Sequence, residues 1–120
     1  MVDITPRVAE LVGDTTGEGV VAVFVPGATA AVTTMEHEPG NVFDLRSLLD
    51  QLVPRDRGWE HNRLNHDTNA HAHIRAAIVG PSETIPFEAG RLMLGTWQQI
   101  VLVDFDDRPR ERTVLVTVIC

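Results

Sequence analysis

The sequence contains no lysine, and all ten of its basic side chains are arginine. Chemistry that needs a lysine amine is therefore excluded, including Schiff-base formation and phosphate binding of the P-loop type. The single cysteine, Cys120, is the last residue, so no disulfide can form within the chain and a reducing compartment is compatible with it. No apolar run approaches the roughly 18 residues of a membrane span, and residues 1–3 lack a signal-peptide pattern. These absences predict a soluble, cytoplasmic protein that does not enter a membrane.

Positive charge is also in short supply. The chain has 17 acidic side chains against ten arginines, with a formal net charge of −7 and an isoelectric point near 5.0. An acidic chain is a poor partner for nucleic acid or for an anionic membrane surface. The length of 120 residues and a hydrophobic fraction of 43% predict a single folded domain over residues 1–120.

The spacing of apolar residues predicts two helices in the first half of the chain. Thr5 is expected to cap a helix over residues 5–12, with Pro6 at its first helical position. A second helix is expected over residues 42–52, after a turn at residues 38–40. Continuous β-branched runs between these helices predict buried strands.

The second half of the chain predicts a long loop, a short helix and several strands. Residues 55–67 form a polar stretch whose length is typical of a functional loop. The helix after it, capped by Asp67 or Thr68, is expected to bury a stripe of apolar residues. Helices mixed with antiparallel strands, without a regular βαβ order, indicate an α+β fold. The expected stripe is Ile74, Ala77 and Ile78, and the expected strands are 20–25, 28–34, 84–87, 91–94, 97–105 and 113–119, the last two joined as a hairpin through residues 106–110.

Four of the five histidines lie between positions 61 and 73, in the predicted loop and at the start of the short helix. Clustered imidazoles suit a divalent transition metal such as zinc, or a histidine that acts as a general acid or base. On a helix, His71 and His73 point about 200° apart and cannot hold one ion, whereas on an extended segment they point the same way. The four residues are His61, His66, His71 and His73.

The same residues also have plainer explanations. A histidine in a loop is usually solvated, and His71 lines up with Ile74 and Ile78, which favours a position at a packing boundary. Glu36 follows a predicted strand and has the chemistry of a metal ligand or a base, but acidic residues at strand ends are more often solvated. The residues alone leave these alternatives open.

Two segments near the middle of the second half resemble a known family. Residues 82–87 read Ser-Glu-Thr-Ile-Pro-Phe, and residues 90–100 read Gly-Arg-Leu-Met-Leu-Gly-Thr-Trp-Gln-Gln-Ile. They are similar to the signature of the YjbQ family, a group often labelled secondary thiamine-phosphate synthase, and Gly-Thr-Trp-Gln is the most specific part of the match. The resemblance extends over nearly the whole chain, through residues 23–36, 60–62 and 66–76.

The resemblance implies an α+β fold with a largely antiparallel sheet or sandwich and a few short helices, assembled as a homotrimer with sites near the subunit boundaries. It also implies a weak transferase activity, which joins a pyrimidine diphosphate to a thiazole phosphate and releases pyrophosphate. Because lysine is absent, arginine or a histidine-bound metal is expected to hold the phosphate groups. The expected site residues are His61, His71 and His73 as ligands of a divalent metal, most simply zinc; Glu36, Asn69 and His73 as catalytic groups; and Arg75, Thr29 and Gln98 as substrate contacts.

The chain departs from the family pattern in two places. Residues 27–30 read Gly-Ala-Thr-Ala where many members have His-Thr-Thr-Ala, and we hypothesise that His71 takes the place of the missing imidazole in space. Members also have a strand before the segment at residues 2–5, which this chain is expected to lack. A non-catalytic protein that binds a metal or a small ligand is the main alternative, and a purely solvated histidine loop is a third.

Overall fold

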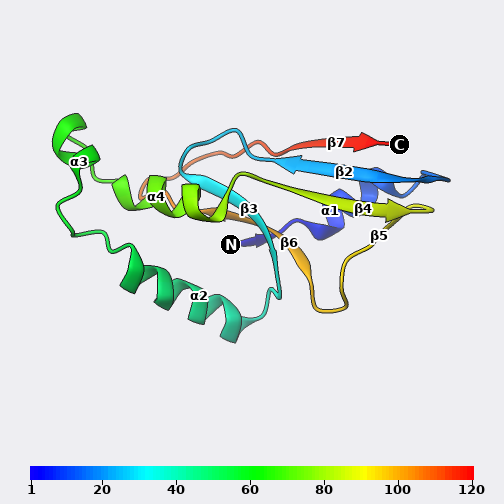
Figure 1. Ribbon diagram of the computed structural model, residues 1–120, viewed down its shortest axis with the longest axis horizontal. Coiled ribbons are helices and arrows are strands. Elements are labelled where there is room, and N and C mark those ends of the chain that lie inside the picture. Colours follow the sequence, from blue (N-terminus) through cyan, green and yellow to red (C-terminus); the bar gives the residue numbers. More distant parts are fainter.

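Two antiparallel sheets and four helices make up the computed structural model, which describes residues 1–120 (Figure 1). One sheet has the strand order β1-β6-β3 and the other the order β5-β4-β2-β7. No helix combines the length and the apolar character needed to cross a membrane. The helices are α1 (Thr5–Val12), α2 (Pro39–Leu52), α3 (Glu60–Asn65) and α4 (Ala70–Val79), and the strands are β1 (Val2–Asp3), β2 (Glu18–Phe24), β3 (Ala30–Met35), β4 (Ser82–Glu88), β5 (Arg91–Leu92), β6 (Gln99–Asp104) and β7 (Leu115–Ile119).

The main core lies between the two sheets and is closed by α1. Alternate residues of each strand point into it because side chains in a strand alternate between the two faces of the sheet. In β2 these are Val21 and Val23, and in β4 they are Ile85 and Phe87, all fully or almost fully buried. The predicted α+β fold with antiparallel sheets is confirmed.

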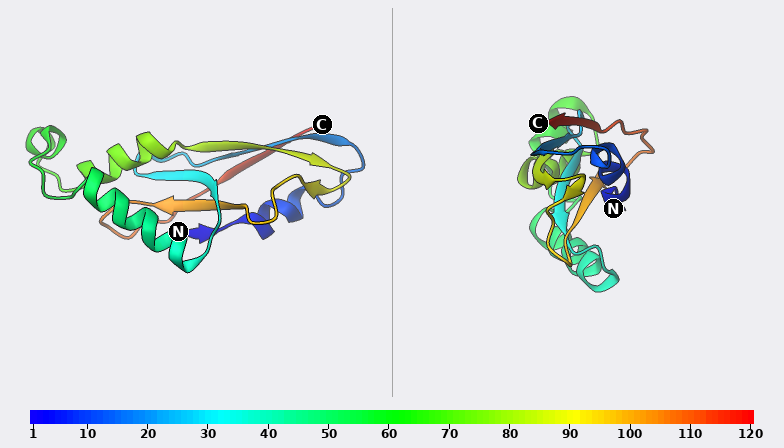
Figure 2. Two further views of the ribbon diagram at one scale, coloured as in Figure 1. Left: turned by 60° about the horizontal axis from the view of Figure 1, so that its bottom comes forward. Right: turned by 90° about the vertical axis from the view of Figure 1, so that its right-hand side faces the viewer.

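A second, smaller core lies on the other face of the three-stranded sheet. Val101 and Val103 of β6 point toward this face, where Leu49 of α2 and the alanines of α4 cover them. The strand β6 is therefore buried on both faces, which explains its continuous apolar sequence. The helices α2, α3 and α4 gather at one end of the molecule, and α1 lies toward the other (Figures 1 and 2). This arrangement brings the histidine-rich segment to the end that the three helices form.

The predicted hairpin between the last two strands is wrong. β6 pairs with β1 and β3, so both of its edges are occupied and β7 cannot pair with it. β7 pairs instead with β2 in the other sheet, with Ala22 opposite Thr117. The intervening segment crosses from one sheet to the other. The Phe105 amide at its start donates to the Thr29 carbonyl, and side-chain bonds such as that from Arg112 to Asp104 hold the rest in place.

Several predicted boundaries also change. The polar stretch 55–67 contains the helix α3, and the segment 38–40 is the start of α2 rather than a turn, with the Glu38 carboxylate accepting hydrogen bonds from two backbone amides of its first turn. These bonds lower the pKa of the Glu38 carboxyl. Thr5 is the first residue of α1 and Ile4 is its cap; the Thr5 hydroxyl accepts from the Ile100 amide and not from an amide of the helix.

The predicted buried stripe of α4 is wrong. Ile78 is 65% exposed, and Ala77 is exposed too. The buried face instead carries small alanines, which let the helix lie close to β3, together with two polar side chains, His71 and Arg75. The cap of this helix is Asn69, two residues or one after those expected.

Candidate functional site

His61 and His73 form a close pair at the junction of α3 and α4. Their ring centroids lie 4.5 Å apart, with the ring planes tilted by 45°. The pair forms because α3 folds back onto the start of α4, where the Ala70 amide donates to the side chain of Asn62. Two of the four clustered histidines therefore share one position in space.

Asn62 also orients the first imidazole of this pair. Its amide oxygen lies 3.2 Å from Nδ1 of His61. Since an amide oxygen can only accept, this contact requires a proton on Nδ1 and leaves the lone pair on Nε2 free. A ligating histidine is commonly held in this way, by a hydrogen bond from its other ring nitrogen to a carbonyl-type oxygen. Asn62 was not among the expected site residues, although its place directly after His61 is a local signal for such a role.

A shallow hollow of about 310 Å³ opens beside His73. Small residues form its floor, so the imidazole is its main polar group. Gly27 is among them. It is the position at which many members of the resembled family have a histidine, and it lines the same hollow as His73. The lining residues are Gly27, Ala28, Ala30, His73, Ala76, Ala77 and Pro81.

The guanidinium of Arg112 takes up space next to Gly27. A Cβ built on Gly27 would lie 2.7 Å from Nη1 of Arg112, far closer than a van der Waals contact. The other two guanidinium nitrogens donate to both oxygens of Asp104, at 2.9 Å each, and to Oγ1 of Thr29, at 2.7 Å. Nη1 makes no hydrogen bond, so it is an unpaired donor on a guanidinium whose other two nitrogens are held in place.

Thr29 links this cation to a second ion pair. Its hydroxyl accepts from Arg112 and donates to the buried carboxylate of Asp106, which also accepts from Arg110. The hydrogen bond from Arg112 holds the pKa of the Asp104 carboxyl below its usual range, and Asp104 in turn raises the pKa of Arg112. Burial opposes ionisation of Asp106, but the bonds from Thr29 and Arg110 outweigh it and keep the pKa of its carboxyl low. The side chains of Asp104, Asp106 and Arg112 are therefore all charged at neutral pH.

His71 and Asn69 lie inside the molecule, apart from the histidine pair. His71 is 1% exposed, and neither of its ring nitrogens has a hydrogen-bond partner; the amide oxygen of buried Asn69 has none either. Because residues 70–79 are helical, the alternative in which His71 and His73 point the same way does not hold. The chain contains no group of three histidine, cysteine or acidic side chains placed to hold a metal ion. One chain by itself therefore does not assemble the expected three-histidine set.

Replacing His71 with leucine should stabilise the protein by about 1 kcal/mol, raising Tm by about 4 °C, because a buried group without hydrogen bonds gives way to an apolar one of similar size. Burial, and then the charges of Arg55 and Arg75, lower the pKa of His71 in the folded state. As pH falls below about 6.5, the unfolded chain takes up this proton first, so the wild type loses stability and H71L loses less. Thermal unfolding at pH 7 and pH 5 measures both effects; a lower Tm for H71L at pH 7 would contradict them.

The other expected site residues lie away from the histidine pair. Glu36 is exposed in the connection from β3 to α2, and Gln98 donates to Oγ1 of Thr34 in the connection before β6. Arg75 is buried; it donates to the Val53 carbonyl and to Asp50, and its place on α4 is about 200° from that of His73. In one chain, Arg75 and His73 therefore cannot act on the same atom.

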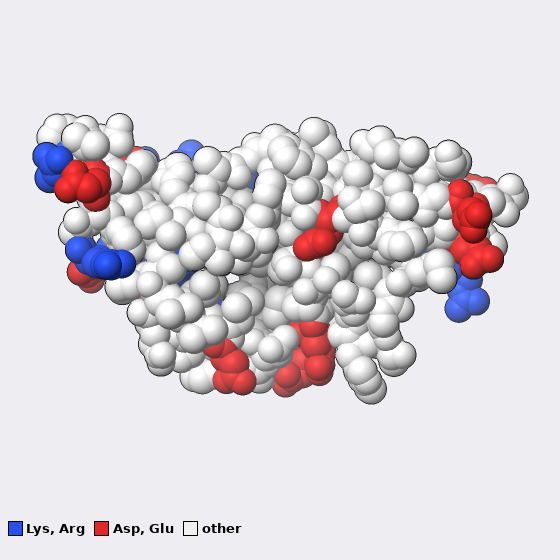
Figure 3. Space-filling view, in the orientation of Figure 1, with Lys and Arg blue, Asp and Glu red and all other residues white.

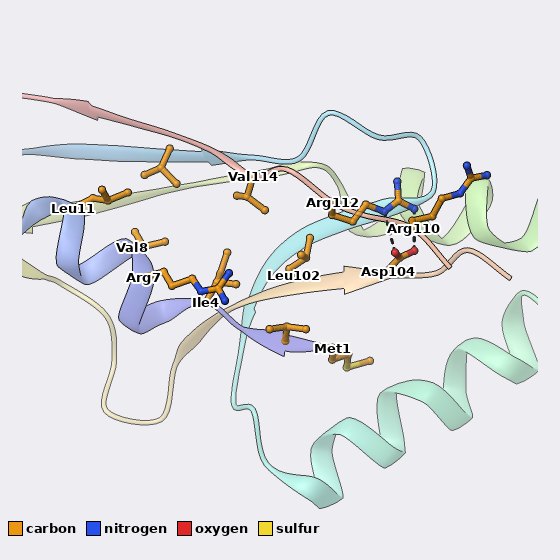
Figure 4. Close-up of a pocket in the computed structure, with 12 residues that line it drawn as sticks. Met1, Ile4, Arg7, Val8, Leu11, Leu102, Asp104, Arg110, Arg112 and Val114 are labelled. Atoms are coloured by element: carbon orange, nitrogen blue, oxygen red, sulfur yellow. Dashed lines mark hydrogen bonds and ion pairs between the residues drawn. The ribbon is translucent and has the colours of Figure 1, made fainter. Parts of the chain in front are cut away.

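The largest cavity, of about 530 Å³, has a different character (Figure 4). It lies between α1, β6 and the segment leading to β7, and its walls are mainly apolar side chains such as Val8, Leu102 and Val114. The ion pair between Arg112 and Asp104 lies at one end of it. No histidine lines this cavity.

Comparisons with known proteins agree on one family. The family model described as UPF0047 protein YjbQ-like matches residues 1–120. A UPF0047 protein of Archaeoglobus fulgidus is 40% identical over 116 residues, which are 97% of this chain and 88% of that protein, and the UPF0047 protein YugU of Bacillus subtilis is 35% identical over 97% and 86%. Among solved structures, a YbjQ-like protein of Sulfolobus solfataricus has a TM-score of 0.90 at 36% identity, over 98% of this chain and 84% of that one. A hypothetical protein of Aeropyrum pernix has a TM-score of 0.88 at 41% identity, over 98% and 87%.

Proposed function

Because the chain belongs to the YjbQ-like UPF0047 family and the names of the members given above state no activity, we propose a function from the site itself. The proposed function is that of a weak transferase for small phosphorylated molecules, with a divalent metal at the His61–His73 pair. The observation that carries the proposal is the imidazole pair, 4.5 Å apart, at the edge of an open hollow. The reaction that the family resemblance suggests is the joining of a pyrimidine diphosphate to a thiazole phosphate.

The two histidines fit half of a metal site. Zinc bonds imidazole nitrogen at about 2.1 Å and usually has four ligands, either four protein groups or three protein groups and a water. The spacing of the pair and the free Nε2 of His61 suit two of these positions. A bound metal would supply a positive charge that stabilises a departing diphosphate. His71 does not fit as the third ligand, because it lies on the buried side of α4.

The remaining ligand is proposed to come from a second copy of the chain in a homotrimer. Glu36 is exposed and free of any side-chain hydrogen bond, and it lies in the connection that leads to α2, away from α3 (Figure 1). An exposed carboxylate that one chain leaves unused suits a site shared between chains. In this arrangement the segment around Glu36 in one copy faces the histidine pair of the next.

Arg112 is proposed as the cation that binds the substrate phosphate at this hollow. Asp104 and Thr29 fix its guanidinium, and the unpaired Nη1 lies where a side chain of residue 27 would begin. A guanidinium held in advance loses little entropy when it binds an oxyanion. Thr29 would then position Arg112. A direct contact of Thr29 or of Gln98 with a substrate stays a prediction.

Thiamine phosphate formation by the pure protein tests this function. We expect activity in the wild type, its loss on treatment with a chelator, its return when zinc is added, and its loss in His73→Ala. The matched control is His66→Asn, since His66 lies outside the pair and asparagine also adopts its left-handed backbone conformation. Activity that ignores both the chelator and the H73A change would rule out the metal at this pair.

A non-catalytic binding protein is the second candidate, because two imidazoles beside an open hollow also suit binding of a metal or a small ligand without any reaction. The same assay separates the two candidates. Zinc bound in a fixed ratio to the chain, without formation of product in any sample, would establish binding as the role and exclude the transferase.

A further inference from the structure

A second, more polar hollow of about 190 Å³ lies between α2, α4 and β6. Three of its lining residues are arginines: Arg46 of α2, Arg55 just after α2, and Arg75 of α4. Arg75 and His73 lie about 200° apart around the same helix, so this hollow is separate from the histidine pair. Three arginines around one hollow are unusual in a chain that carries an excess of acidic groups.

The ion pairs of the neighbourhood leave two of these arginines unused. The hollow is also lined by Asp50, Asp104 and Asp106, and each of these carboxylates already has an arginine partner. The side chains of Arg46 and Arg55 form no ion pair and no hydrogen bond in the structure. The local charge balance is therefore positive, in contrast to the small separate groups of both signs seen on the face of the molecule in Figure 3.

Arg75 provides a fixed floor for the hollow. Its Nε and Nη2 donate to the carbonyl oxygen of Val53, at 3.2 and 2.8 Å, and Nη2 also donates to Asp50 at 3.1 Å. These bonds leave Nη1 without a partner. The side chain of Arg75 is only 11% exposed, so its guanidinium is held in place before any ligand arrives.

We propose that this hollow is a binding site for a phosphate group, held by the free Nη1 of Arg75 and by the exposed guanidiniums of Arg46 and Arg55. Planar guanidiniums pair with the oxygens of phosphate through two parallel hydrogen bonds, and a buried, fixed one gives the site its geometry. The ligand is inorganic phosphate or a small phosphate monoester, since the hollow is small and its apolar wall is limited to Met1, Leu49, Val103 and Phe105. The site does not depend on the proposed metal or on the transferase reaction.

Titration of the metal-free protein with inorganic phosphate, followed by NMR of the backbone amides, tests the proposal. We expect saturable shifts that concentrate at residues 46–55 and around Arg75. The double variant R46A/R55A should bind at least about tenfold more weakly, a loss of about 1.4 kcal/mol. It should keep the Tm of the wild type, because neither side chain makes a contact that the fold uses.

The control removes the same amount of charge elsewhere. Arg7 and Arg91 are exposed, form no ion pair and do not line this hollow, so R7A/R91A matches the net charge of the test variant. Its phosphate affinity should stay within about twofold of the wild type, apart from weak long-range effects. Equal loss in both double variants, or shifts that do not saturate, would overturn the proposal. Because no metal or product enters this test, the phosphate site can fail it while the proposed function stands. The proposed function can likewise fail its own assay while the phosphate site stands.

Discussion

The variant Arg112→Ala should lose about 2 kcal/mol of unfolding free energy and about 8 °C in Tm. Arg112 binds Asp104 through two hydrogen bonds and Thr29 through a third, and its side chain is 13% exposed. Removing one partner of a buried pair costs about 3–5 kcal/mol because the other charge is left alone. The expected cost is smaller here, since Asp104 is one-third exposed to water.

The loss should be large for a second reason. The segment between β6 and β7 makes one backbone hydrogen bond, from the Phe105 amide to the Thr29 carbonyl at its start, so side-chain bonds from Arg110 and Arg112 are what hold the rest of it against the sheets. The control is Arg63→Ala, which breaks the exposed ion pair with Glu60 and should change stability by less than about 0.5 kcal/mol. Urea unfolding of the three proteins measures both values. A cost for R112A no larger than that for R63A would show that this pair does not hold the segment.

The effect of R112A should also depend on pH. Arg112 lowers the pKa of the Asp104 carboxyl in the folded protein, so its contribution is fully present above the unfolded pKa of about 3.9. As pH falls below that value, protonation of Asp104 removes the contribution. The difference between the wild type and R112A should therefore be constant from pH 5 to 7 and shrink below about pH 4.

The second large effect concerns zinc affinity. His61→Ala and His73→Ala should each weaken zinc binding by more than about 100-fold, because each removes one of the two imidazoles and the other cannot hold the ion alone. Asn62→Ala should weaken it by about tenfold, since His61 then loses the contact that fixes its tautomer. Calorimetric titration with zinc gives the affinities.

One histidine provides the comparison for this series. His66 ends α3 with its backbone in the left-handed region, which asparagine also adopts. It does not belong to the pair, so H66N should bind zinc like the wild type. Affinity that falls equally in all the histidine variants would indicate non-specific binding and contradict the assigned site.

The strands were the most predictable part of the fold. Val21 and Val23 in β2, or Ile85 and Phe87 in β4, alternate with less buried residues, and this local pattern is enough to place a strand and its inner face. The partner of each strand is not a local property. The assumed pairing of β6 with β7 failed because β1 and β3, far away in the sequence, occupy both edges of β6.

The site was predictable only in part, and the reason lies in α4. The density of histidines drew attention to this region, and the structure brings the rings of His61 and His73 together there; that both serve one site stays a prediction. Apolar spacing placed Ile78 inside and gave no reason to bury His71 or Arg75, because tight packing of alanines against β3 decides the buried face. Arg112 was missed altogether, since an arginine in a proline-containing connection looks solvated until its contacts with Asp104 and Thr29 are known.

The central claim is that the imidazoles of His61 and His73 bind a divalent metal. Crystals of the protein soaked in zinc and measured at the zinc absorption edge test it directly. The account predicts an anomalous peak about 2.1 Å from a ring nitrogen of each of these two histidines. Zinc bound at full occupancy at other side chains, with no anomalous peak at this pair, would contradict it.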